Sequence, residues 1–194
     1  MAFKLKYDNI ENYLKSYGRY IVRQARKILE QRGKNTTGKL SKSLKYKIEE
    51  TKEGYDIKFL ASKYAAFVNK GVSGKQSRRT YIDINGKRKV SPFKFKKQPP
   101  SNVIESWIKN RGIQGRSAGT KYKLKDGTVK RSGAGRFMKR KSLAFLIAKS
   151  IKRKGIPGVS FYTQPLSFSF NKFKKDMITH FKTDVLNEIK TFNK

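Results

Sequence analysis

The side chains that could do chemistry are few and scattered. The chain has no cysteine and one histidine, His180, which excludes disulfides, thiolate metal sites and a histidine-based metal centre. Asp83, Glu105 and Asp126 are the acids of the central region, but metal-dependent nuclease chemistry needs several acids converging on one place, and these three fall in separate turn and helix contexts. No phosphate-binding glycine loop, nucleophile elbow or paired-histidine zinc motif occurs. We therefore predict a protein that is not an enzyme and has no cofactor and no metal.

Positive charge is the most unusual property of the chain. Its 194 residues contain 48 Lys and Arg against 13 Asp and Glu, a net charge of +35. Residues 72–141 hold 21 of these cations and three acids, about half of the net charge in little over a third of the length. Such a surface favours an anionic partner, namely nucleic acid, an acidic protein face or a membrane surface.

Eight cations in this basic stretch are candidates for contacting double-stranded DNA. Phosphate contact needs cations without a sequence code, and turn-rich loops bring many of them together. Phe93 and Phe95 alternate with lysines, which is typical of a ribbon with one aromatic and one basic face. Acidic neighbouring subunits and a solvated surface are the alternatives, and the charge count does not separate them. The candidates are Arg78, Arg79, Lys87, Arg88, Lys89, Lys94, Lys96 and Lys97.

Hydrophobic spacing predicts long helices near both ends of the chain. Apolar residues recur every three or four positions over 10–31 and again over about 169–191, where the side from Phe170 to Ile189 is expected to lie in the core. The alternative for part of this side is a contact with a neighbouring subunit through the dense aromatic residues Phe168, Phe170 and Phe173. Leu143, Leu146 and Ile147 indicate a further helical face, closed by Gly155.

Alternating apolar and polar residues predict β-hairpins. Residues 44–48 and 55–59 form one of them across a turn at 52–54, and the Asn-Gly pair at 85–86 and the Asp-Gly pair at 126–127 indicate two more. The whole pattern predicts one α+β domain: an N-terminal helix, an antiparallel β-hairpin or small sheet, and C-terminal helices packed on it. Its core consists of residues 1–71 and 142–194, interrupted by the basic, turn-rich insertion 72–141.

Three aromatic residues are candidates for a subunit interface. Trp107 belongs to a short helix predicted to begin at Ser101 or Asn102, and large aromatic side chains dominate binding hot spots. The alternative for Trp107 is that this helix packs back on its own domain. Tyr64 and Phe67 are most simply core residues, and an interface is their alternative.

Four local patterns follow one another along the chain. They are Thr37-Gly38-Lys39-Leu40 before Ser43-Leu44, the run Tyr64–Gly71, the run Trp107–Ile113, and the run from Phe145 through Gly155 and Phe161 to Leu166. These patterns and their order resemble the tail-completion (neck) proteins of tailed bacteriophages, and the resemblance spans most of the sequence. Asn69 stands where the second pattern has an acid in that family.

The resemblance implies a virion structural protein. Such a protein forms a homo-oligomeric ring of six or twelve copies in the neck, where it joins the head connector to the tail. It contacts other neck, connector and tail proteins and lies close to the path of the double-stranded DNA. The alternative is a free-standing basic protein that binds nucleic acid without sequence preference. No apolar run is long enough to span a bilayer, and the N-terminus lacks the apolar segment of a signal peptide. We expect synthesis in the host cytoplasm and no membrane partner.

Overall fold

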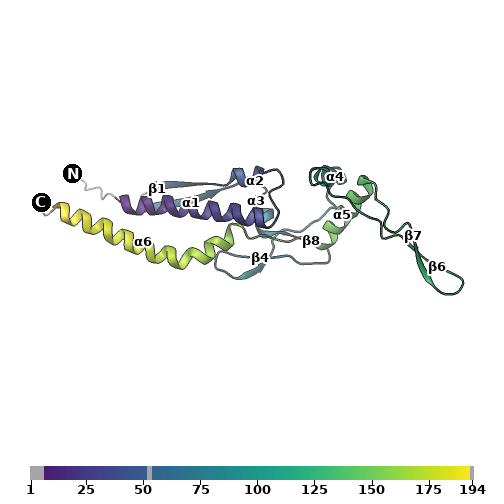
Figure 1. The fold of residues 1–194 in the computed structure, drawn as a ribbon. Coiled ribbons are helices and arrows are strands. Elements are labelled where there is room, and N and C mark those ends of the chain that lie inside the picture. Colours follow the sequence, from purple (N-terminus) through teal and green to yellow (C-terminus); the bar gives the residue numbers. More distant parts are fainter. Residues whose placement is uncertain (1–6, 52–53, 193–194) are drawn as a thin grey trace. The chain divides into compact units, whose positions relative to one another are not determined.

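The computed structural model describes residues 7–51 and 54–192 and has the predicted α+β class. A long N-terminal helix and a long C-terminal helix accompany small antiparallel two-stranded sheets, β1–β2, β3–β8, β4–β5 and β6–β7 (Figure 1). Within the described residues, no helix is long and apolar enough to cross a membrane. In chain order the elements are α1 (Asp8–Gln31), α2 (Lys39–Ser43), β1 (Lys45–Thr51), β2 (Gly54–Leu60), α3 (Ala65–Lys70), β3 (Val72–Ser73), β4 (Thr80–Ile82), β5 (Arg88–Val90), α4 (Ser101–Asn110), β6 (Thr120–Lys123), β7 (Val129–Ser132), α5 (Arg140–Lys154), β8 (Gly155–Ile156) and α6 (Thr163–Phe192).

Contacts between the elements divide the chain into two units. Unit 1 comprises Met1–Gly71, Thr80–Ser91 and Pro157–Lys194, and unit 2 comprises Val72–Arg79 and Pro92–Ile156. The β4–β5 hairpin, which belongs to the predicted insertion, groups with unit 1, whereas α5, which belongs to the predicted core, groups with unit 2. The single domain interrupted at 72–141 stays a prediction.

α1 carries the longest buried stripe of unit 1. Ile10, Leu14, Ile21 and Ala25 recur at helical spacing and are almost fully buried, which confirms the helix predicted over 10–31. The helix begins two residues earlier than predicted. It ends before Gly33, whose φ of 61° is a conformation that glycine adopts without steric cost.

The β1–β2 hairpin packs on α1 and confirms the first predicted hairpin. Tyr46 lies opposite Phe59 and Ile48 opposite Ile57, while residues 52 and 53 of the predicted turn lie outside the described residues. Gly18 allows this packing, because a Cβ there would overlap the ring of Tyr46. The core continues from the C-terminal half of α1 into the neighbouring segments through Val22, Ala25, Leu29, Leu40, Leu44, Ala65, Val159 and Phe161.

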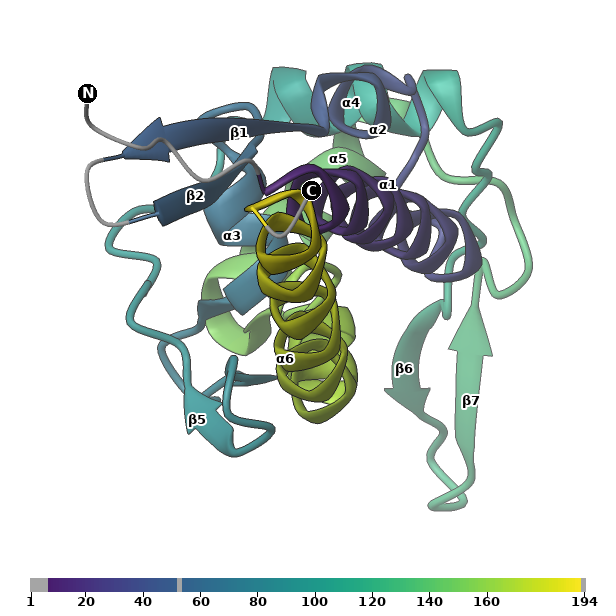
Figure 2. The same ribbon diagram turned by 90° about the vertical axis from the view of Figure 1, so that its left-hand side faces the viewer.

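α6 packs against α1 (Figures 1 and 2). Aromatic rings and polar groups form the contact. Tyr13 stacks on His180 with ring centres 4.7 Å apart, and Tyr17 lies 4.4 Å from Phe173. The Tyr13 hydroxyl donates a 3.0 Å hydrogen bond to Asp176. His180 therefore has a packing partner in the helix interface.

Asp184 of α6 closes the N-terminal end of α1. Its carboxylate, only 4% exposed, accepts the backbone N–H groups of Asn9 (3.1 Å) and Ile10 (3.0 Å) and the side-chain amide of Asn9 (2.8 Å). The first N–H groups of a helix have no partner within it, and the helix dipole favours an anion there. One carboxylate thus both caps α1 and holds α6 beside it.

In unit 2, α4 packs against α5. Ile108 of α4 is 1% exposed, and Ala144 and Ala148 of α5 are fully buried. The face predicted for α5 was partly wrong, since Leu146 is 49% exposed. The reason is that small alanines permit close helix approach but contribute little to a hydrophobic pattern.

The β4–β5 and β6–β7 hairpins confirm the other two predicted turns, and they share one turn geometry. The Gly86 N–H donates to the carbonyl of Asp83 (3.1 Å), and the Gly127 N–H donates to that of Leu124 (3.0 Å). Gly86 and Gly127 have φ values of 77° and 85°. A turn followed by a left-handed glycine of this kind is a common hairpin connection.

The cap formed by Asp184 predicts a specific loss of stability. Asp184→Ala leaves buried N–H donors without an acceptor and should lower the free energy of unfolding by about 1–3 kcal/mol. Asp184→Asn should cost less, because the amide oxygen still accepts. Chemical denaturation of both variants measures the effect, and equal stability of the alanine variant and the wild type would show that the cap is not needed.

Candidate nucleic-acid interface

Positive charge is densest in unit 2. That unit contains 22 Lys and Arg against two acids, a net charge of +20, whereas the larger unit 1 contains 26 against 11, a net charge of +15. Internal ion pairs can therefore neutralise few of the cations of unit 2. Its surface is the stronger candidate for binding a polyanion.

Five of the eight predicted cations lie in unit 2. Phe93 and Phe95 are half-buried and bond through their backbones to Ser73 at 2.7 and 2.9 Å, so the predicted ribbon has an inner aromatic side. Arg79 is partly committed to its own fold, because its Nε donates to the carbonyl of Lys154 at 2.6 Å. The exposed members are Arg78, Lys94, Lys96 and Lys97.

The other three predicted cations, Lys87, Arg88 and Lys89, lie on the β4–β5 hairpin of unit 1. Lys89 forms a 2.8 Å ion pair with Asp83, which is 5% exposed. The contact with Lys89, helped by the N–H groups of Lys87 and Asn85, lowers the pKa of Asp83. Asp83 therefore largely neutralises the charge of Lys89 within the hairpin.

Arg88 faces an open hollow of about 250 Å³ in unit 1. Arg32, Thr80 and Gln164 also line this hollow. Two guanidinium groups around one hollow suit a phosphate oxygen. Among the three predicted cations of this hairpin, Arg88 has the surroundings that best fit an anion.

The aromatic interface candidates are exposed. Trp107 is 40% exposed, Tyr64 44% and Phe67 47%. The core placement of Tyr64 and Phe67 was wrong, because the six-residue α3 buries its opposite side through Ala65 and Asn69. Their role in an interface stays a prediction.

Asn69 has an internal role. It is 7% exposed, and its side-chain oxygen accepts the Tyr162 N–H at 3.0 Å. Its backbone carbonyl accepts the Ser160 N–H at 2.9 Å. Its side chain joins α3 to the start of α6 rather than facing a partner.

The central acids are used locally. The Asp83 and Asp126 carboxylates accept N–H groups of their own turns, Asp126 from Thr128 at 2.8 Å. Glu105 lies on α4 of unit 2, whereas Asp83 belongs to unit 1. In the part of the chain that the structure describes, no group of three or more His, Asp or Glu could hold a metal ion.

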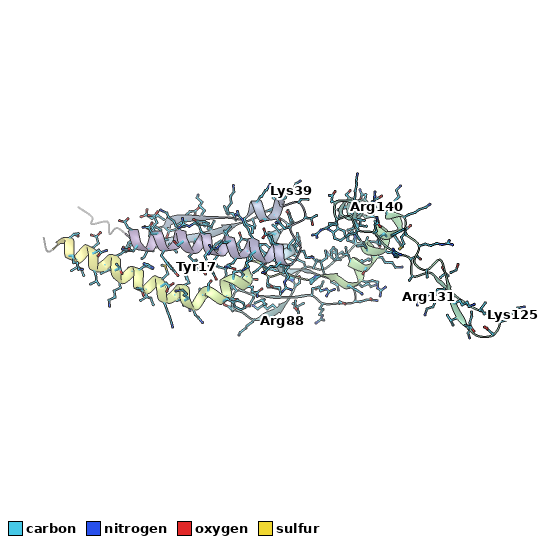
Figure 3. All side chains as sticks on the ribbon, viewed as in Figure 1. Tyr17, Lys39, Arg88, Lys125, Arg131 and Arg140 are labelled. Atoms are coloured by element: carbon cyan, nitrogen blue, oxygen red, sulfur yellow. The ribbon has the colours of Figure 1, made fainter. Side chains whose placement is uncertain are left out.

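Sequence reasoning missed the cations of the β6–β7 hairpin. Lys121 lies directly opposite Arg131, and all five cations between residues 121 and 131 are exposed. Figure 3 shows the side chains of Lys125 and Arg131 on this hairpin. The lysines at alternate positions 121, 123 and 125 were the sequence pattern that could have predicted this cationic hairpin.

A cationic groove along α1 was also missed. It has a volume of about 740 Å³, an apolar floor of Val22, Leu44 and Tyr46, and cations that include Arg19, Arg23, Lys27 and Lys45. Three of these recur at spacing four on α1, where like charges repel. Arg26, beside them, donates to the carbonyls of Ser41 and Leu44 at 3.1 Å each.

One side of α6 is apolar and exposed. Ile178 is 69% exposed, Phe181 50%, Leu186 45% and Ile189 49%. The predicted core position of Phe181 and Ile189 was therefore wrong. The reason is that α6 meets α1 through another side, which carries Phe173, Asp176, His180 and Asp184. Phe170 is 42% exposed, and its alternative role in a contact with a neighbouring subunit stays a prediction.

Comparison of the chain with protein-family models, curated proteins and solved structures finds no match. The resemblance to neck proteins therefore rests on the four sequence patterns.

The Asp83–Lys89 pair predicts a pH-dependent stability. Because the pKa of Asp83 in the fold lies below its unfolded value near 4, its ionised form stabilises the protein above about pH 4. This contribution is lost as the pH falls through the folded pKa. Melting of wild type and Asp83→Asn between pH 7 and pH 2 should show a Tm difference at pH 7 that shrinks below about pH 4. A difference that is constant across this range would contradict the assignment, and Glu105→Gln is the matched control.

Proposed function

We propose that this chain is a non-enzymatic structural subunit that assembles into a homo-oligomeric ring beside double-stranded DNA. The observation that carries the proposal is the exposed apolar side of α6 on a protein with a net charge of +35. Such a charge keeps copies apart and favours solubility. Exposed apolar patches on such a surface mark interaction sites.

The sequence patterns support a particular setting for this subunit. They resemble phage tail-completion proteins, which implies a ring of six or twelve copies in the neck of the virion, between the head connector and the tail. Exposed Trp107, Tyr64 and Phe67 supply further aromatic surface for neighbouring subunits.

A ring also needs an anionic partner. Each added copy brings a further +35, and the repulsion between copies is relieved when a polyanion lies beside them. The genomic DNA that passes through a phage neck is such a partner. Cations without base-reading geometry suit DNA of any sequence.

Assembly through α6 predicts the effect of polar substitutions. Ile178→Ser combined with Ile189→Ser should abolish self-association and leave the melting transition near that of wild type, because both side chains are exposed in the single chain. Light scattering coupled to gel filtration measures the mass, and electron micrographs show whether annuli form.

Ile84→Ser combined with Val90→Ser is the matched control, since both side chains are 51% exposed but belong to the β4–β5 hairpin and not to α6. A wild-type protein that stays monomeric at all concentrations, yet binds DNA, would favour the alternative of a free-standing nucleic-acid-binding protein.

DNA proximity predicts salt-sensitive binding. The purified protein should bind duplexes of unrelated sequence with similar affinity. If about six phosphates are contacted, log K should fall with log[salt] at a slope of about −5. Fluorescence anisotropy between low and high salt measures this slope, and an affinity independent of salt would remove DNA from the proposal.

A further inference from the structure

The β6–β7 hairpin of unit 2 is an exposed ribbon made largely of cations. Figure 1 shows it extending away from α4 and α5 of the same unit. Val129, the apolar residue opposite Lys123, is 57% exposed, so it contributes little to holding the ribbon. Its cations are Lys121, Lys123, Lys125, Lys130 and Arg131.

The charges of this ribbon oppose its own folding. Lys121 and Arg131 are a directly opposed cross-strand pair, and like charges in such positions are destabilising. A two-stranded hairpin alone is at best marginally stable in water. The nearby acid, Asp126, accepts the Thr128 N–H in the turn, and in the described part of the chain no ion pair joins an acid to these five cations. An external anion would relieve the repulsion.

Cations lie on both faces of the ribbon. The register places Lys121, Lys123 and Arg131 on one face and Lys130 on the other, because successive residues of a strand alternate. A flat acidic protein surface would meet one face and leave the other without a partner. A groove with phosphates on both walls meets both.

We infer that the β6–β7 hairpin is a ribbon that enters the major groove of duplex DNA and contacts phosphates on both sides of the groove. The major groove of B-form DNA admits a two-stranded β-ribbon, whereas that of duplex RNA is too narrow and deep. This inference rests on the DNA-binding part of the proposed function and names the element that carries it. It moves the main contact away from the predicted cations between Arg78 and Lys97.

Two matched variants test the assignment. In the hairpin variant, Lys121, Lys123, Lys130 and Arg131 are all replaced by Gln. In the control variant, Arg78, Lys94, Lys96 and Lys97 are replaced by Gln. Both sets are exposed, both belong to unit 2 and both lower the net charge by four, so a general charge effect is the same for each.

The readout is the salt dependence of binding to a duplex of about 20 base pairs. Each lost phosphate contact lowers the slope of log K against log[salt] by about 0.9, so the hairpin variant should lose about 3 to 4 units of slope and the control variant less than 1. The wild type should also bind the DNA duplex more tightly than an RNA duplex of the same sequence.

Three results would overturn the inference. The first is a hairpin variant with the slope of wild type. The second is an equal loss of slope in both variants. The third is a hairpin variant that binds DNA normally but fails to enter particles, since that result would assign the ribbon to an acidic protein. A wild type that forms annuli but binds no duplex would remove the DNA part of the proposed function and keep the ring.

A footprint on the wild-type protein keeps the test independent of folding of the variants. Modification of lysine amines with and without DNA, read by mass spectrometry, should show protection of Lys121, Lys123 and Lys130. Lys39, on α2 of unit 1, serves as an unprotected reference. Full reactivity of the hairpin lysines in the complex would overturn the inference without any substitution.

Discussion

The chain has 13 acids against 48 cations, so its fold must form despite strong repulsion between positive charges. Several of the acids have defined structural positions. Asp184 caps α1, Asp83 and Asp126 shape the turns of two hairpins, and Glu49 bridges Lys47 and Lys58 across β1 and β2. Because the acids are committed in this way, few remain to pair with cations at the surface. The excess charge is thus available to an external anion.

The α1–α6 interface shows how the fold holds together despite this repulsion. Stacked rings and hydrogen bonds, such as those of Tyr13 and Tyr17, do not depend on opposite charges. They use one side of α6 and leave another side, with Ile178 and Ile189, exposed. A helix with a polar and aromatic side and a separate apolar side can fold with the first and assemble with the second. This division is what makes an oligomeric role compatible with a stable single chain.

Periodicity was enough to predict α1, α6 and the three hairpins, because each of these elements depends on local spacing or on an Asn-Gly or Asp-Gly turn. It was not enough to orient them. Asp184 accepts a hydrogen bond from Asn9, which lies 175 positions away in the sequence. On α5, Ala144 and Ala148 are fully buried, although the hydrophobic pattern predicted that bulkier residues of this helix form the buried face. Tyr64 and Phe67 were assigned to the core by residue type, although a six-residue helix buries only one side. The buried side of a helix depends on the helix or strand that packs against it, and the local hydrophobic pattern does not identify that neighbour.

A charge count has the same limit at the candidate site. Lys89 and Lys121 are equal in a count of cations, but Lys89 faces a buried carboxylate at 2.8 Å whereas Lys121 faces Arg131. A phosphate that approaches Lys89 must compete with Asp83. A phosphate that approaches Lys121 instead relieves a repulsion that the fold already contains. The free energy gained on binding therefore differs between the two lysines even at equal exposure, and it is larger where the folded chain has left like charges face to face.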